Sequence, residues 1–142
     1  MKSASFLMAA ICCLLLASCA QHVKSSKAPG ANLANMKAFY VQKHAEDGRG
    51  IESVIAGQLN AKGFKATSGA GTKPPANADA QVTYVDHWMW DITMYLLKLD
   101  IQITDAKTGA ILAKGEAMHT SLARKSPEYM AREILDDIFK AN

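Results

Sequence analysis

The sequence predicts an α+β domain, a two-layer sandwich in which a mostly antiparallel sheet carries two helices on one face, in the order β-α-β-β-β-β-α. Apolar and polar residues alternate strictly between residues 97 and 104, which is typical of a strand with one solvated face. Apolar residues recur at helical spacing in residues 51–64 and again in 126–142. Since each strand buries one face, both helices are expected on that face.

The first strand and first helix are expected within residues 36–64. "MKAFYVQKH", residues 36–44, favours a strand with Phe39 and Val41 inward, and "EDGRG" interrupts it. The helical spacing that follows is carried by Ile51, Val54, Ile55 and Leu59. Gly63 stands where a glycine commonly ends a helix. "FKAT" is then a short strand, and "SGAGTKPPANAD" is a flexible loop.

The next two strands are the most informative part of the sequence. In "ADAQVTYVDHWMW", one parity is apolar except for Asp86; its members are Ala80, Val82, Tyr84, Trp88 and Trp90. In "MYLLKLDIQIT", the inward set is Tyr95, Leu97, Leu99, Ile101 and Ile103, and the outward set is Lys98, Asp100, Gln102 and Thr104. Both segments are therefore predicted to bury one face.

The last strand and helix follow a turn at "DAKTG". "AILAKGEAMHT" favours a strand whose inward residues are mostly small: Ile111, Ala113, Gly115 and Ala117. Small side chains leave room for a helix to lie close. That helix is expected to start with Ser126 as N-cap, Pro127 at its first position and Glu128 at the positive end of its dipole. Its apolar stripe is Met130, Ile134, Leu135 and Ile138.

The N-terminus has the pattern of a secretory signal. Lys2 precedes an apolar run at residues 6–17, which is shorter than the about 20 residues of a spanning helix. The run ends in "LASC", which resembles the bacterial lipobox of aliphatic and small residues before a cysteine. An ordinary signal containing a cysteine is the alternative, but the AxA-like cleavage site that it favours is missing.

The lipobox resemblance implies cleavage before Cys19 and lipid on its thiol and its new amino group. Residues 1–18 are then a signal peptide, residues 19–35 the lipidated cysteine with a flexible tether, and residues 36–142 one periplasmic domain. Ala20, rather than Asp, after the cysteine implies the outer membrane. Cys12 and Cys13 leave with the signal, so the mature domain is expected to be stable without disulfides.

The expected layout resembles that of small Gram-negative envelope lipoproteins, including the lipopolysaccharide-assembly lipoprotein. "KGF" at residues 62–64 and "ADAQVTY" at residues 78–84 carry the likeness. It implies a fold and an envelope setting, but no activity.

Charge argues against nucleic acid as a partner. The chain has 16 Lys and Arg against 13 Asp and Glu, and these are dispersed. "KSSK", residues 24–27, is a small basic spot that either touches anionic lipid headgroups or is solvated linker.

The stretch "DHWMWDITMY", residues 86–95, contains both tryptophans and joins two strands. Two interpretations stay open: the aromatics close the end of the core, or they form a docking surface, since binding hot spots favour Trp and Tyr. The candidate binding residues are Trp88, Trp90, Tyr95, His87 and Met89.

Catalytic and metal signatures are weak. There is no GxSxG motif, and the four histidines lack metal-ligand spacing, so neither a metal nor a cofactor is expected. We expect a non-enzymatic binding or assembly accessory of the envelope, with a protein or a glycan or lipid as its partner. Alternatives are a small glycan hydrolase using Asp86 or Asp91, or a purely structural coat lipoprotein.

Overall fold

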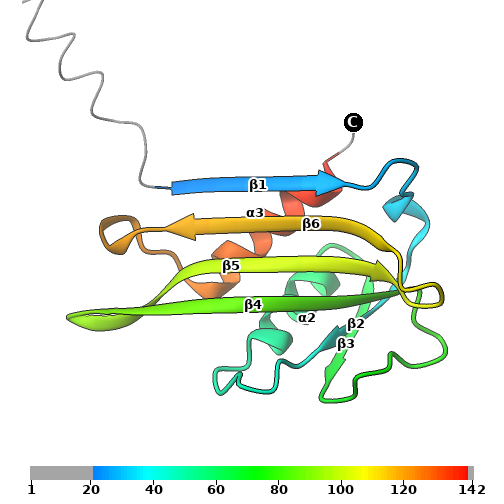
Figure 1. Ribbon diagram of the computed structural model, residues 1–142, viewed down its shortest axis with the longest axis horizontal. Helices are drawn as coiled ribbons and strands as arrows, with labels where there is room; N and C mark the ends of the chain where they lie inside the picture. The colour runs from blue at the N-terminus through cyan, green and yellow to red at the C-terminus, as the bar shows by residue number, and fades with distance from the viewer. Residues whose placement is uncertain (1–20, 141–142) are drawn as a thin grey trace, which may run out of the picture.

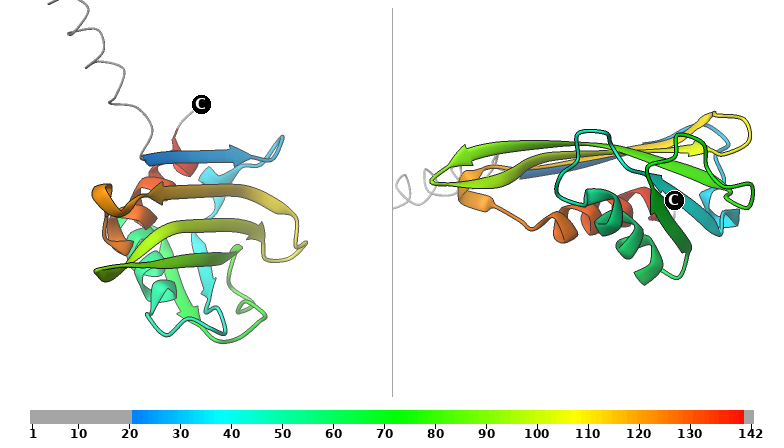
Figure 2. Two further views of the ribbon diagram at one scale, coloured as in Figure 1. Left: turned by 60° about the vertical axis from the view of Figure 1, so that its left-hand side comes forward. Right: turned by 90° about the horizontal axis from the view of Figure 1, so that it is seen from below.

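The computed structural model describes residues 21–140, which form one six-stranded sheet with both α-helices on one of its faces (Figures 1 and 2). This arrangement confirms the predicted α+β class. In chain order the elements are β1 (Gln21–Lys27), the 3-10 helix η1 (Leu33–Asn35), β2 (Ala38–Gln42), α2 (Ile51–Ala61), β3 (Lys65–Gly69), β4 (Ala80–Asp91), β5 (Thr93–Asp105), β6 (Ile111–His119), the 3-10 helix η2 (Ser121–Ala123) and α3 (Pro127–Phe139).

The sheet is mixed, with the strand order β1-β6-β5-β4-β2-β3. β1, β6, β5 and β4 pair antiparallel in succession, whereas β2 runs parallel to both β4 and β3. The parallel pair arises because α2 carries the chain from β2 back to the start of β3. The sheet therefore has an antiparallel part, β1-β6-β5-β4, and a parallel part, β4-β2-β3.

β1 corrects the sequence-based expectation of a flexible tether up to residue 35. Residues 21–27 pair with β6 along their whole length, and Val23 packs against the core. Two side chains also bind the end of α3: the Ser25 hydroxyl donates to Asp137 at 2.6 Å, and Lys27 Nζ donates to the Lys140 carbonyl at 2.8 Å. Composition alone did not indicate a strand, because an edge strand is stabilised by a partner that lies far away in sequence.

The core lies between the sheet and the two helices. All four residues of the predicted stripe of α3 are fully buried, which confirms the stripe. Gly115 on β6 lies directly under α3, and a Cβ atom there would stand 2.5 Å from Cγ2 of Ile134. The small residues of β6 therefore let α3 approach the sheet closely, as predicted.

The helix ends follow their sequence signals in part. The Ser126 hydroxyl accepts the N–H of Tyr129 at the start of α3, and Gly63 follows α2 with a φ of 91°. The N-cap of α2 is Gly50, which has no side chain to accept a hydrogen bond, so the first N–H groups of the helix need another acceptor. No helix within residues 21–140 combines the length and apolar character needed to cross a membrane.

Candidate functional site

The hairpin of β4 and β5 extends beyond the rest of the sheet at one end of the molecule (Figures 1 and 2). β4 has 12 residues and β5 has 13, whereas β6 has 9. β6 pairs with β5 from Lys98 to Thr104, so residues 93–97 have β4 as their partner in the sheet. We call the protruding part, residues 88–96, the arm.

A β-bulge at the base of the arm resets which side chains enter the core. His87 pairs with Lys98, but Trp88 pairs with Leu96, so Leu97 is an extra residue. Leu96, at 1% exposure, takes the buried position that simple alternation assigned to Leu97. The prediction that Tyr95 and Leu97 point inward is therefore wrong: Tyr95 pairs with Met89 on the face away from the helices.

Trp88 closes the end of the core. Its half-buried ring packs against the core cluster, and its Nε1 donates to Asp86 at 2.6 Å. The guanidinium of Arg49, from the loop after β2, lies 4.1 Å from the ring centroid. The indole is thus held by apolar contact, a charge-assisted hydrogen bond and a cation–π contact.

Trp90 lies on the same face of β4 but reaches past the helices, and 69% of it is exposed. The core-cap interpretation therefore fits Trp88 but not Trp90. Alternation placed both rings on the helix-covered face, yet that face has no helix beneath it at the end of the arm (Figure 2). The length of the arm relative to the helices, which no local pattern specifies, separates the two residues.

The turn at the end of the arm is strained and apolar. Ile92 has a φ of 62°, in the left-handed region where β-branched residues are rare, and it is 86% exposed. Glycine or asparagine would relieve the backbone, which costs about 1–2 kcal/mol for an L-residue in this region. Ile92 is therefore unfavourable for the isolated domain because of its backbone strain and because its apolar side chain is exposed to water.

Arg124 braces this turn from the segment after β6. Its guanidinium donates to the Asp91 carbonyl at 2.7 Å and to Thr93 Oγ1 at 2.6 Å, and lies 4.6 Å from the centroid of the Tyr95 ring. It also pairs with the Asp91 carboxylate at 3.5 Å, which accepts a hydrogen bond from Ser121 as well. The arm is therefore held to η2, whose Leu122 is 100% exposed.

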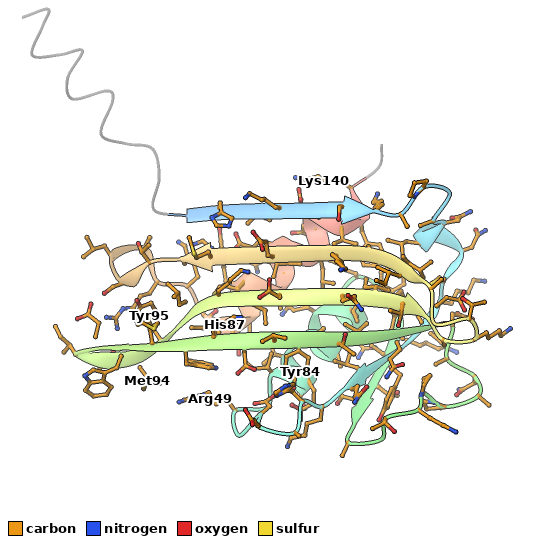
Figure 3. The ribbon with its side chains drawn as sticks, viewed as in Figure 1. Arg49, Tyr84, His87, Met94, Tyr95 and Lys140 are labelled. Carbon is orange, nitrogen blue, oxygen red and sulfur yellow. The ribbon has the colours of Figure 1, made fainter. Side chains whose placement is uncertain are left out.

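Exposed apolar side chains consequently gather at this end of the molecule. Figure 3 shows Met94 and Tyr95 on the arm, and His87 nearer the body of the sheet. We call the following set the apolar tip: Met89, Trp90, Ile92, Met94 and Leu122. Met89 lies on one face of the arm, and Trp90 and Met94 lie on the other.

The second surface is the sheet face opposite the helices, which we call the open face. An open groove of about 820 Å³ crosses it over β1, β6, β5 and β4. Its rows of paired residues are mostly polar: one row is Thr83, Gln102, Lys114 and Ser26, and the next is Val85, Asp100, Glu116 and Lys24. His87, Met89 and Tyr95 continue this face toward the arm.

Charged side chains cross the open face as an alternating network. Lys98 Nζ lies 2.8 Å from Asp100 and 3.0 Å from Glu116, which raises the pKa of Lys98. The hydrogen bonds from Lys98 and from His22, 3.1 Å away, lower the pKa of Glu116. His87 lies 3.2 Å from Asp100 at the other end. Basic side chains that donate hydrogen bonds and acidic side chains that accept them are therefore held in fixed positions along one surface.

Asp47 organises the loop at the edge of the groove and was missed in the sequence. Its buried carboxylate accepts the N–H groups of Arg49, Gly50 and Ile51 and the hydroxyl of Tyr84, at 2.6–3.0 Å. Burial alone would raise the pKa of Asp47, but the hydrogen bonds from Tyr84 and the backbone hold it well below its usual value. Burial and the bond to Asp47 raise the pKa of Tyr84. An acid a few residues before a helix that starts without a side-chain cap was the available signal.

Asp86 and Asp91 are not brought together as a catalytic pair. They lie on opposite faces of β4, and at about 3.3 Å per residue their Cα atoms are roughly 16 Å apart, beyond the separation used by paired glycosidase carboxylates. Asp86 binds Trp88, and Asp91 binds Ser121 and Arg124. Within residues 21–140 no group of three His, Cys, Asp or Glu residues is placed to hold a metal ion.

Comparisons with known proteins show the fold. No protein-family model matches the chain, and no curated protein matches it in sequence. Among solved structures it is similar to the PelC dodecamer from Paraburkholderia phytofirmans, with a TM-score of 0.61 and 15% identity over 86% of this chain and 99% of that one. A point variant of that dodecamer matches with a TM-score of 0.61 and 17% identity, over 83% and 96% of the two chains.

Two further structures are more distant. A PDZ domain protein from Parabacteroides distasonis has a TM-score of 0.50 and 17% identity, over 81% of this chain and 34% of that one. A minor lipoprotein from Acinetobacter baumannii matches at a TM-score of 0.31 with 15% identity, over 72% and 86% of the two chains. At these identities the likeness to PelC shows a shared α+β fold and leaves the role to be argued from this chain's own surfaces.

Proposed function

We propose that this protein is a non-enzymatic lipoprotein of the bacterial cell envelope, held at a membrane by lipid on Cys19, whose domain binds or helps to assemble another envelope component. The lipobox at residues 16–19 supports the anchor. Ala20 after the cysteine favours the outer membrane, with the domain facing the periplasm. Asp86 and Asp91 are each engaged in structural hydrogen bonds, which favours binding over hydrolysis.

The observation that carries the binding role is the open face. Both helices cover the other face, so this one presents a groove of about 820 Å³ lined by hydroxyl, amide and charged side chains. Such a surface suits an extended polar chain, a glycan or a protein segment, because its donors and acceptors are already oriented. The proposed surface continues toward the arm through His87, Met89 and Tyr95. Trp88 packs against the core on the opposite face of β4.

Photocrosslinking in the native host tests this proposal. A photoreactive residue at Gln102, inside the groove, is expected to give a covalent adduct with one recurring envelope component. The matched control is the same residue at Arg132, which is exposed on α3. The binding role is refuted if position 102 yields no adduct, or yields the same adducts as position 132.

A further inference from the structure

We propose that the apolar tip enters the headgroup boundary of the same leaflet that holds the Cys19 lipid, so that the domain has a second, protein-based membrane contact. This inference rests on the lipid anchor of the proposed function. It assigns a lipid surface as the partner of the tip, separate from the partner of the open face.

The apolar tip consists of large apolar side chains that are exposed to solvent. Trp90, Ile92 and Leu122 are 69%, 86% and 100% exposed, and Met89 and Met94 are 48% and 42% exposed. Monomeric soluble proteins rarely present contiguous apolar surface of this kind unless something covers it. Tryptophan is also the residue enriched at the boundary between headgroups and acyl chains.

The distribution of these side chains favours a lipid medium over a flat protein partner. Met89 lies on one face of the arm, Trp90 and Met94 on the other, and Ile92 at the turn between them. A partner docked on one face would leave the opposite face in water. A bilayer surrounds the tip on all sides, so it covers both faces at once.

The N-terminal strand begins at the same end of the molecule as the apolar tip. β1 starts at Gln21 opposite His119, the last residue of β6, and η2 follows directly. Figure 1 shows the start of β1, η2 and the arm at the same end of the molecule. β1 and β4 run in opposite directions, so the first residue of β1 lies at the end of the sheet at which β4 reaches the tip.

Simple lengths show that the anchor and the tip reach the same level. His22 and His87 lie in one row across the sheet, through Met118 and Lys98. From that row, β4 runs five residues to Ile92, about 16 Å at strand spacing. Cys19 precedes His22 by three positions, so its Cα atom lies at most about 11 Å beyond the row. Ile92 therefore extends further from the row than Cys19 can, so a bilayer surface held at Cys19 is within reach of Ile92.

The polar groups at the tip are compatible with this contact. Asp91 is neutralised by Arg124, and its carbonyl also accepts from that guanidinium. The hairpin pairs Met89 with Tyr95 and Trp90 with Met94, so the backbone groups between its two strands are bonded. Those on its two outer edges have no neighbouring strand within residues 21–140, which limits the contact to the hydrated headgroup boundary and excludes the hydrocarbon interior. Arg124 and Lys125 stand just behind the tip, where cationic side chains meet anionic headgroups.

A site-specific environmental probe tests the proposal in the full-length lipoprotein, purified from its host and placed in liposomes. The mature chain has Cys19 as its single cysteine, so Ile92→Cys adds one free thiol for a fluorescent label. The matched control is Lys107→Cys, on the exposed turn between β5 and β6 at the opposite end. We expect a blue shift and quenching by brominated acyl chains at position 92, and neither at position 107.

The outcomes separate this inference from the anchor itself. If the protein does not float with the liposomes, the lipid anchor and the proposed function fail. If it floats but the label at position 92 behaves like that at position 107, the anchor stands and membrane entry of the tip is refuted. Shielding that disappears when the protein is diluted in excess lipid would assign the tip to a second copy of the chain and would also overturn the inference. Trp90→Ser should reduce the quenching at position 92 without lowering the melting temperature.

Discussion

Asp47 shows how much one carboxylate contributes to the shape of this domain. It supplies the acceptors that the start of α2 lacks, and its bond to Tyr84 ties the same loop to β4. The loop in turn places Arg49 over Trp88. A chain of contacts therefore runs from one buried acid to the base of the arm.

Asp47→Asn should lower the free energy of unfolding by about 3 kcal/mol at pH 7, because an amide nitrogen would face N–H groups that now have a charged acceptor. The pKa of Asp47 is lowered from 3.8 on folding, so its contribution is complete above pH 3.8 and declines as the pH falls below that value. Urea unfolding of the variant and the wild type at several pH values measures both effects. Glu46→Gln, at an exposed neighbour, is the control, and an equal loss in both variants would contradict the assigned role.

The two tryptophans should respond differently to truncation. Trp88→Ala removes core contact, the bond to Asp86 and the contact with Arg49, and we expect a loss of about 2–4 kcal/mol. Trp90→Ala should change stability by less than about 0.5 kcal/mol, since the ring is mostly in solvent. Thermal melting of the two variants checks this, and equal shifts would mean that both rings belong to the core.

At the scale of elements, the packing of α3 on β6 depends on the absence of a side chain at Gly115. The close approach of Ile134 and Ile138 leaves no room for a methyl group there. The other helix offers a contrast, because Gly57 in α2 has open space around the position of a Cβ atom.

Substituting alanine for these two glycines should give effects of opposite sign. Gly115→Ala forces Ile134 or the helix to move, and we expect a loss of about 1–3 kcal/mol. Gly57→Ala should stabilise by about 0.5–1 kcal/mol, because it reduces backbone entropy in the unfolded chain at a helical position. Chemical denaturation of the pair measures both. A destabilising Gly57→Ala would show that α2 is packed more tightly at that residue than the structure has it.

The pairing of β1 with β6 predicts slow hydrogen exchange in β1. Because β1 is an edge strand, only alternate N–H groups donate to β6: that of Ala28 donates to the Leu112 carbonyl at 2.9 Å, and by alternation those of Ser26 and Lys24 also donate to β6. These amides should exchange with solvent more slowly than those of the loop at residues 70–77. Native-state hydrogen exchange measures this directly. Equal rates in the two segments would restore the flexible tether that the composition suggested.

For the whole molecule, the pairing of β1 sets how the domain would stand on a membrane. A strand that starts two residues after Cys19 leaves little freedom between anchor and body, whereas a tether to residue 35 would have let the domain turn freely. With lipid on Cys19, as proposed, the end that carries the arm would face the bilayer, and the strands of the open face would run away from the bilayer surface (Figure 1).

Cys19→Ala should move the protein from the membrane fraction to the soluble fraction of its host, because the acylated thiol would be gone. The apolar tip alone is too small to hold the domain for long. Fractionation with immunoblotting measures the distribution, with Cys12→Ala as the control, since that residue belongs to the predicted signal. Unchanged membrane association of Cys19→Ala would contradict the anchor.

Local sequence patterns were enough to predict the α+β class, both helices, the later strands and the inward face of most of them. These features depend on spacing within one element, such as the stripe from Met130 to Ile138 or the cap at Ser126, and local sequence encodes that spacing. Three features came only from the folded arrangement: residues 21–27 form an edge strand, Leu97 is the extra residue of a bulge, and Trp88 is covered while Trp90 is exposed. Each of these depends on another element of the fold rather than on spacing within one element. The edge strand needs β6, the bulge needs the register of β4 against β5, and the exposure of the two indoles depends on how far the helices extend beneath the sheet (Figure 2).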